Sequence, residues 1–110
     1  NLLENPVYVN SSVQSSEKDF KLSQNFPNPF NPETKISYEL KSAGQVSLIV
    51  YDLNGREIFK LVNEKQVSGL HILNFSGEKL SSGVYFYKLT VKPIKSSAIN
   101  SETRKMLLVK

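Results

Sequence analysis

Residues 25–32 constrain the fold of this chain more than any other part of its sequence. Three prolines alternate there with asparagines and with Phe26 and Phe30. Proline holds φ at about −65° and has no backbone donor, and it pushes the preceding residue toward extended conformations. The segment is therefore excluded from a helix and from a central strand. We expect an extended edge in which both phenylalanines bury against a core, while Pro27 and Pro29 make no ladder hydrogen bonds.

After Pro32 the sequence alternates between apolar and polar residues in short runs separated by turn residues. This spacing is typical of an antiparallel β-sandwich. Run 45–53 is apolar on both faces, which predicts a central strand covered on both sides. Asn54-Gly55 predicts a type I′ hairpin turn. The expected strands are 35–40, 45–53, 56–62, 69–75, 84–91 and 104–109.

The length of the chain allows one core and not two, so we predict one all-β sandwich of six or seven strands over residues 20–110. Residues 1–19 differ, because the stretch 10–19 is rich in serine, glutamine and charge. Such a composition indicates a linker or tail. Residues 2–3 and 6–9 are apolar enough for a short N-terminal strand.

Residue types that carry catalysis are scarce. The chain has no cysteine, which excludes disulfides, thiol nucleophiles and thiolate metal sites. The one histidine, His71, alternates with Leu73 and Phe75 and is expected to be a partly buried structural residue. Asp52 is expected to cap the following turn, and no carboxylates are spaced for calcium or paired acid–base work. The sequence indicates no enzyme, cofactor or metal, and favours a binding, structural or addressing module.

The charge pattern says little about partners. The formal net charge is +4 and the isoelectric point is about 9.3, but the lysines are scattered along the sequence. Nucleic-acid binding is not predicted, since the aromatics follow strand periodicity as core residues do. No run approaches the ~18 apolar residues of a membrane-spanning helix. The chain begins with Asn1 rather than Met, so we expect a fragment or a processed chain, with any export signal lying upstream.

Several blocks, taken in order, resemble the C-terminal sorting domains of the bacterial type IX secretion system. The first is LSQNFPNPFNPETKISY at 22–38. The next blocks are VYDLNGR at 50–56, LV at 61–62, GLH at 69–71, SGVYFYKL at 82–89 and KMLLVK at 105–110. The resemblance spans about residues 20–110. The chain departs from it at 73–77, where many members carry Trp-Asp-Gly after the histidine and Phe75 stands in for the aromatic. The blocks also resemble the Ig-like domain of flagellar hook-capping proteins.

The resemblance implies an Ig-like sandwich of about seven strands that is the sorting and anchoring module of a larger exported protein. It implies secretion to the medium or to the outer-membrane surface of a Gram-negative bacterium. The implied partners are the outer-membrane translocon, its shuttle proteins and a sortase-like peptidase that cuts upstream of the domain. A cut is expected within 11–19, where Ser15 and Ser16 suit a preference for small residues. Self-association stays open.

Carried onto this sequence, the resemblance implies three sorting motifs. They are Pro27 and Pro29, then Gly83 and Tyr85, then the terminal Lys105, Met106, Leu107, Leu108, Val109 and Lys110. Each also has a plain structural explanation. Gly83 allows a turn with positive φ, and Tyr85 suits a buried Ig-type tyrosine whose hydroxyl finds a backbone partner. The terminal run is apolar on both faces, which leaves one face spare on an edge strand that is open to a partner's sheet.

Two other functions stay open at this point. One is a structural Ig-like module of an extracellular assembly, in which residues 7–9 complete a neighbour's sheet. The other is a carbohydrate-binding sandwich, which the lack of tryptophan and of an evident aromatic platform disfavours.

Overall fold

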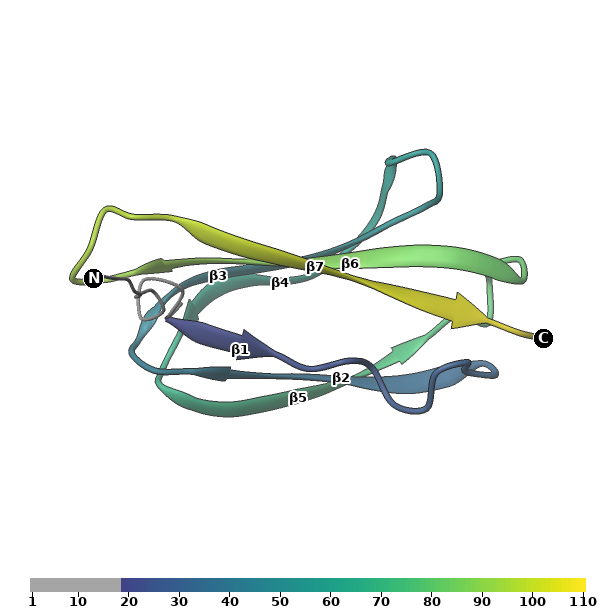
Figure 1. Ribbon diagram of the computed structural model, residues 1–110, viewed down its shortest axis with the longest axis horizontal. Coiled ribbons are helices and arrows are strands. Elements are labelled where there is room, and N and C mark those ends of the chain that lie inside the picture. The colour runs from purple at the N-terminus through teal and green to yellow at the C-terminus, as the bar shows by residue number, and fades with distance from the viewer. Residues whose placement is uncertain (1–18) are drawn as a thin grey trace, which may run out of the picture.

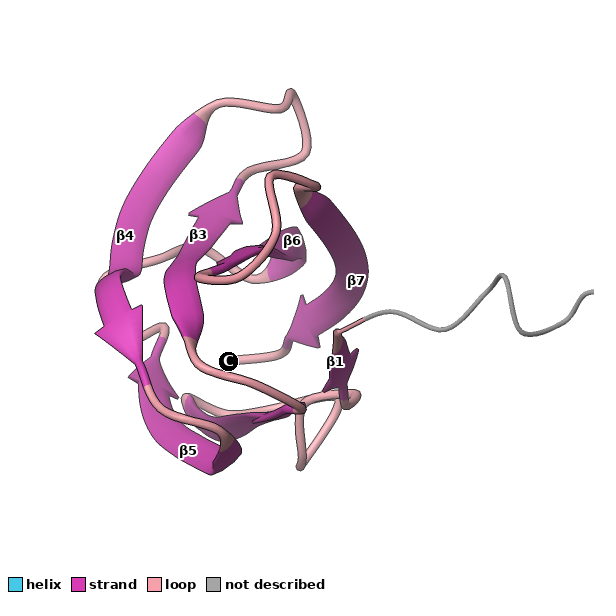
Figure 2. Cartoon of the chain, turned by 90° about the vertical axis from the view of Figure 1, so that its left-hand side faces the viewer, coloured by secondary structure: helices cyan, strands magenta, loops and turns pink. Residues whose placement is uncertain are grey.

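The structure, a computed structural model, describes residues 19–110, which form seven antiparallel strands in two facing sheets (Figure 1). One sheet has the order β1-β2-β5 and the other β4-β3-β6-β7 (Figure 2). The strands are β1 (Phe20–Leu22), β2 (Glu33–Leu40), β3 (Gly44–Tyr51), β4 (Glu57–Gln66), β5 (Gly69–Ser76), β6 (Gly83–Pro93) and β7 (Asn100–Leu108). The predicted Ig-like sandwich is thus confirmed, with β4 and β7 longer than their sequence patterns indicated.

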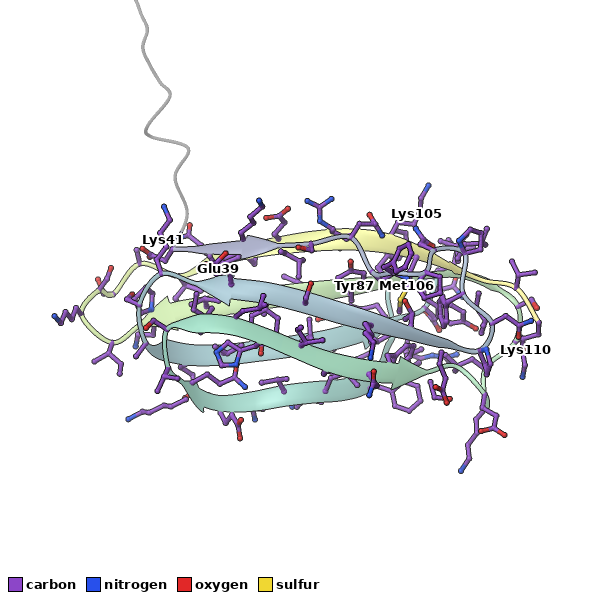
Figure 3. The ribbon with its side chains drawn as sticks, turned by 90° about the horizontal axis from the view of Figure 1, so that it is seen from below. Glu39, Lys41, Tyr87, Lys105, Met106 and Lys110 are labelled. Carbon is purple, nitrogen blue, oxygen red and sulfur yellow. The ribbon has the colours of Figure 1, made fainter. Side chains whose placement is uncertain are left out.

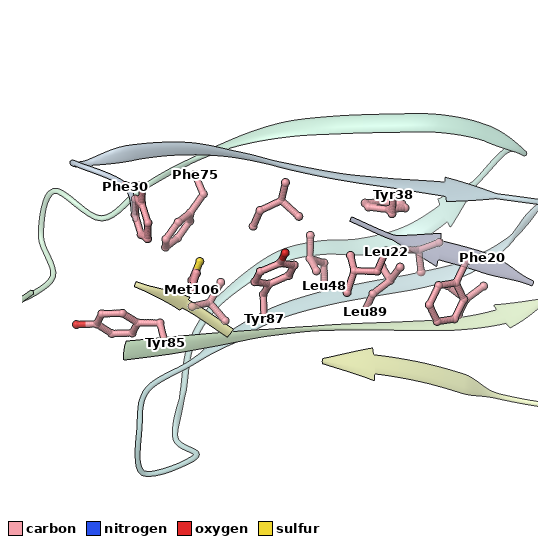
Figure 4. Close-up of a cluster of buried hydrophobic side chains, with 14 of the residues drawn as sticks. Phe20, Leu22, Phe30, Tyr38, Leu48, Phe75, Tyr85, Tyr87, Leu89 and Met106 are labelled. Carbon is pink, nitrogen blue, oxygen red and sulfur yellow. The ribbon is translucent and has the colours of Figure 1, made fainter. Parts of the chain in front are cut away.

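The core lies between the sheets and follows the alternation of the strands (Figure 4). On β2, β3 and β6 every second side chain is buried, because successive side chains point to opposite faces. The fully buried set includes Ile36, Tyr38 and Leu40 of β2, Val46, Leu48 and Val50 of β3, and Tyr87, Leu89 and Val91 of β6.

The prediction for β3 is right in one respect and wrong in another. The strand is central, since it pairs with β4 on one side and β6 on the other. Its second apolar face is not covered, and Ile49 and Tyr51 are only half-buried on the outside of the sheet. A two-layer sandwich has no third layer to place there, so these side chains rely on their cross-strand neighbours.

The turn after β3 also differs from its prediction. The i to i+3 hydrogen bond runs from the Gly55 N–H to the Asp52 carbonyl at 2.9 Å, so Leu53 and Asn54 are the central residues. Gly55 follows them with φ of 84°, which is the pattern of a three-residue loop ending in a bulge rather than a type I′ turn. Asp52 caps it as expected, because its Oδ1 accepts the N–H groups of Asn54 and Arg56, each at 2.9 Å. The bond from the Arg56 N–H is the main reason why the pKa of the Asp52 carboxyl is lowered.

The proline-rich segment crosses from one sheet to the other. Phe26 exchanges both backbone hydrogen bonds with Lys35 of β2, at 3.0 and 2.9 Å. Four residues later, Phe30 donates to the Leu107 carbonyl and accepts from the Val109 N–H, each at 2.9 Å. Residues 26–30 therefore leave the edge of the three-stranded sheet and join the edge of the four-stranded sheet.

Only one of the two phenylalanines is buried. Phe30 is 1% exposed and packs against Phe75 with ring centroids 6.1 Å apart (Figure 4). Phe26 is 79% exposed, so the prediction that it joins the core is wrong. Residues four apart on an extended strand share a face, but the change of sheet between these two breaks that parity.

A buried polar network fixes the start of this crossing. The Tyr87 hydroxyl donates to the Ser23 carbonyl and accepts from the Asn25 N–H, both at 2.7 Å. The Asn25 side chain, almost fully buried, donates to Thr34 Oγ1 at 3.0 Å and to the Pro27 carbonyl at 3.1 Å. Buried polar groups are costly unless paired, and here the partners include Thr34 of one sheet and Tyr87 of the other.

A second tyrosine links the sheets at the opposite end of the core. Tyr38 of β2 donates its hydroxyl to Gln66 of β4 and stacks its ring on His71, with centroids 5.3 Å apart. Burial raises the pKa of both Tyr38 and Tyr87 to about 12, because the charged phenolate would lose its hydration.

We expect Phe30→Ala to lower the free energy of unfolding by roughly 3–5 kcal/mol, because it empties a fully buried aromatic site. Phe26→Ala is the matched control and should change stability by less than about 0.5 kcal/mol, as exposed sites do. Urea denaturation of both variants measures the difference. Equal effects would contradict the burial described above.

We expect stability to fall at alkaline pH in a way that depends on Tyr87. A tyrosine with a raised folded-state pKa contributes its full stabilisation below the unfolded value of about 10 and loses it as pH rises through about 12. Unfolding free energies at pH 9 and pH 11.5 should differ more for the wild type than for Tyr87→Phe, which has no ionisable group there. Lysines are the same in both proteins, so their contribution to the pH dependence cancels in the comparison. Equal pH dependence would show that the hydroxyl is not desolvated.

Candidate functional site

The three candidate sorting motifs, far apart in the sequence, meet at one end of the sandwich (Figure 1). In the ladder between β6 and β7, Gly83 faces Leu108 and Tyr85 faces Met106. On the other edge of β7, Phe30 bridges to Leu108. We call this region, residues 27–30, 83–85 and 105–110, the motif end.

The prolines of the first motif are exposed and hold polar partners in place rather than pack. The Pro27 carbonyl accepts the hydroxyl of Thr34 at 2.8 Å. Asn28, held between Pro27 and Pro29, accepts the Leu107 N–H on its side-chain oxygen at 3.0 Å. Two adjacent fixed φ angles limit the orientations of Asn28, so the motif positions a side chain that contacts the last strand.

The second motif has the local structure that its residue types predict. Gly83 has φ of 152° at the entry to β6, a conformation that favours glycine. The Tyr85 hydroxyl donates to the Ser81 carbonyl at 2.7 Å. A tyrosine near the start of this strand that bonds to backbone a few residues upstream is a feature of Ig-like sandwiches. Both residues thus have a full structural explanation.

The terminal motif divides its side chains between the core and the surface. Met106 and Leu108 are fully buried, whereas Leu107 is 38% exposed and Val109 is 47% exposed. Figure 3 shows Met106 directed inward, toward Tyr87, and Lys105 directed outward. The spare apolar face predicted for this strand therefore exists.

Lys110 lies against the turn before β6 rather than free in solvent. Its ammonium donates to the carbonyls of Glu78 at 2.6 Å and Leu80 at 3.1 Å. Its backbone N–H donates to Ser82 Oγ at 3.0 Å. The last residue is thus tied to the loop that leads to the second motif.

The backbone edge of β7 is not open at the motif end, contrary to the prediction that it is available to a partner's sheet. Asn28 and Phe30 take the outward-facing hydrogen-bonding groups of Leu107 and Val109. Gln24 donates its side-chain amide to the Lys105 carbonyl at 2.8 Å. A partner strand would have to displace these contacts, so recognition without unfolding depends on side chains.

Close packing locks Leu108 into this arrangement. A Cβ added to Gly77 would lie 2.8 Å from Leu108 Cδ2 and 3.2 Å from Phe30 Cε2. Side chains from the first and last motifs therefore press together against the Gly77 backbone. Removing the terminal residues would empty a core position, not only shorten an edge strand.

His71 has the geometry expected of a structural residue. It is half-buried, stacks on Tyr38, and places Nε2 2.8 Å from the Val67 carbonyl. Among residues 19–110 no group of three or more histidine or carboxylate side chains is placed to hold a metal ion. In that same part of the chain no helix is long and apolar enough to cross a membrane.

Sequence reasoning missed the polar residues that hold the motif end together. The sequence pattern indicates only loop and strand positions for Asn25, Asn28 and Thr34, and one of three successive aromatics for Tyr87. The asparagines in the proline-rich run are a usable signal, since asparagine side chains bond readily to nearby backbone. The distant partners of these asparagines, Tyr87 and Leu107, have no signal in the sequence. The expected N-terminal strand lies outside the described residues, as does nearly all of the 11–19 stretch expected to hold the cut.

Comparisons with known proteins agree with this geometry. Residues 24–107 match the family described as secretion system C-terminal sorting domain. No curated protein matches the chain. Among solved structures the fold is similar to part of dimeric latent PorU from Porphyromonas gingivalis, with a TM-score of 0.66, 18% identity and 82% of this chain covered. The chain spans 9% of the length of that protein. Because the family match covers most of the chain, including the first two motifs and the start of the third, the chain belongs to the family of C-terminal sorting domains of the type IX secretion system.

Proposed function

We propose that residues 20–110 are the address of an exported protein and that the motif end is the element that the secretion machinery recognises. The observation that carries this proposal is the meeting of three separate motifs around the end of β7, where Leu107 and Val109 are exposed and alternate with the buried Met106 and Leu108. Exposed apolar side chains on a rigid support suit recognition by a partner.

The partners follow from the family. Sorting domains of this family are not catalytic, and their cargo is exported to the cell surface or the medium of Gram-negative bacteria. We infer that this domain is recognised by the outer-membrane translocon and its shuttle proteins, and that a sortase-like peptidase cuts upstream of the sandwich. At 18% identity the likeness to PorU supports the fold alone. The structural-module and carbohydrate-binding alternatives are not favoured by the family match.

The test has to leave the core intact. Deleting residues 107–110 would remove Leu108, which is fully buried, and would confuse misfolding with loss of the signal. Leu107→Ser with Val109→Ser changes only exposed side chains. Leu70→Ser with Ile72→Ser, on the outer face of β5, removes apolar side chains that are 65% and 58% exposed and serves as the matched control.

We expect the Leu107→Ser, Val109→Ser variant of a reporter fused to residues 1–110 to accumulate in the periplasm of a bacterium that has the type IX system. Losing two apolar contacts of roughly 1 kcal/mol each should reduce export by about tenfold or more. Cell fractionation measures export and circular dichroism of the purified domain measures folding. Normal export of the folded variant would refute recognition at the motif end.

A further inference from the structure

Five lysines share the outer face of the four-stranded sheet, although they are scattered in the sequence. Cross-strand partners share a face, and the register places Lys60 opposite Ile49 and Lys88 on the other side of the same residue. In the same way Lys65 and Lys92 flank Gln45, and Lys105 lies opposite Phe86. We call this set, with the residues between them, the lysine face.

Almost no negative charge offsets these lysines. Glu57 is the carboxylate that the register places on this face, opposite Tyr51. Within residues 19–110 the ion pairs join Arg56 to Asp52 and Arg104 to Glu102, and neither includes a lysine of this face. Five lysines against one glutamate give the lysine face as much positive charge as the net +4 of the whole chain.

The outer face of the other sheet differs in its charge pattern. There Lys21 lies opposite Glu39, and Lys35 donates to the side-chain oxygen of Asn74 at 3.0 Å. Charges of both signs alternate across that sheet, as on an ordinary solvated surface. The single-sign field is therefore a property of one face of the sandwich.

The part of the lysine face nearer the motif end contains an apolar cluster. Tyr51 and Phe86 lie directly opposite each other in the ladder between β3 and β6, and Ile49 follows on the same face. All three are half-buried with no layer above them. Protein interfaces usually combine an apolar, aromatic cluster with charged residues at its margin, and this face has both.

The lysine face is continuous with the motif end. Val84 lies opposite Leu107 in the ladder between β6 and β7, and Phe86 lies opposite Lys105. Two residues of the terminal sorting motif thus belong to the same surface as the aromatic pair. Recognition of the terminal motif from outside the sandwich would bring a partner over this sheet.

We propose that the lysine face docks onto an acidic protein surface of the secretion machinery, an inference that rests on the function proposed above. Complementary charge steers such an encounter and fixes its orientation, while the apolar cluster supplies contact area. Membership of the sorting family implies partners in the secretion machinery. This favours a protein surface as the occupant over a glycan or a nucleic acid.

The size of the face suits a transient complex. Four strands at about 4.8 Å spacing and eight residues at about 3.3 Å rise give an area of roughly 500 Å². Stable complexes bury about 800 Å² per partner, and transient ones less. A contact of this area is therefore in the range of transient complexes.

Charge reversal tests the proposal. In the reporter fused to residues 1–110, Lys60→Glu with Lys92→Glu alters two exposed lysines outside the three motifs. Export should fall by about tenfold or more, because each reversal replaces an attraction with a repulsion. Lys21→Glu with Lys79→Glu makes the same change of charge on exposed residues elsewhere and should export normally. Normal export of the folded Lys60→Glu, Lys92→Glu variant overturns the proposal.

A photo-crosslinking amino acid at position 86 identifies the class of partner in the same cells. We expect one protein adduct that is lost in the Lys60→Glu, Lys92→Glu background and is not formed from the control position Ile72 on the outer face of β5. An adduct that contains a glycan or a nucleic acid instead of a protein overturns the proposal, as does equal crosslinking from both positions. If circular dichroism shows that the charge-reversed variant is misfolded, the neutral variant Lys60→Gln with Lys92→Gln is tested instead. Its export should be reduced, and unchanged export would contradict the proposal.

The two proposals fail in different ways. If the domain is not the address, the Leu107→Ser, Val109→Ser variant exports normally as well. If only the docking surface is wrong, that variant is retained while the Lys60→Glu, Lys92→Glu variant is exported.

Discussion

The arrangement of the whole sandwich depends on residues 25–30 satisfying backbone hydrogen bonds in both sheets. The start of the segment is held by Tyr87, whose hydroxyl bonds to the backbone of Ser23 and Asn25. At its end Phe30 pairs with β7 and fills the core beside Phe75. Pro27 and Pro29, which lie between these two ends, have no backbone N–H, so no donor is left unsatisfied where the segment passes from one sheet to the other. One short segment thus ties the two layers together and closes an edge of each.

This crossing explains why the three candidate sorting motifs cannot be separated from the fold. The terminal motif is held between the first motif and the second, and alternate side chains along it enter the core. Leu107 and Val109 are held in place only when their neighbours are packed in the core. A partner that binds these two exposed side chains would therefore bind the folded sandwich and not the unfolded chain. A signal built in this way is complete only in a folded domain, because its parts come from residues about eighty positions apart.

The two outer faces of the sandwich have different chemistry although both are made of alternating strands. The outer face of the β1-β2-β5 sheet mixes charges of both signs, with Lys21 opposite Glu39. The outer face of the other sheet gathers lysines around Tyr51 and Phe86. An uncovered aromatic pair on a central strand costs solubility, and the surrounding lysines offset that cost. The asymmetry gives the domain one face suited to docking and one suited to solvent.

The sequence by itself determined the fold class and most strands of this protein, because period-two alternation depends only on local chain geometry. It also determined the family, since the motif blocks lie in order along the chain. Only the tertiary structure decided which residues distant in the sequence lie next to one another. It showed that Phe26 is exposed, that the edge of β7 is occupied at the motif end, and that scattered lysines form one face. Each of these depends on the pairing register of strands distant in sequence or on a change of sheet, and neither leaves a periodic signal in the local sequence.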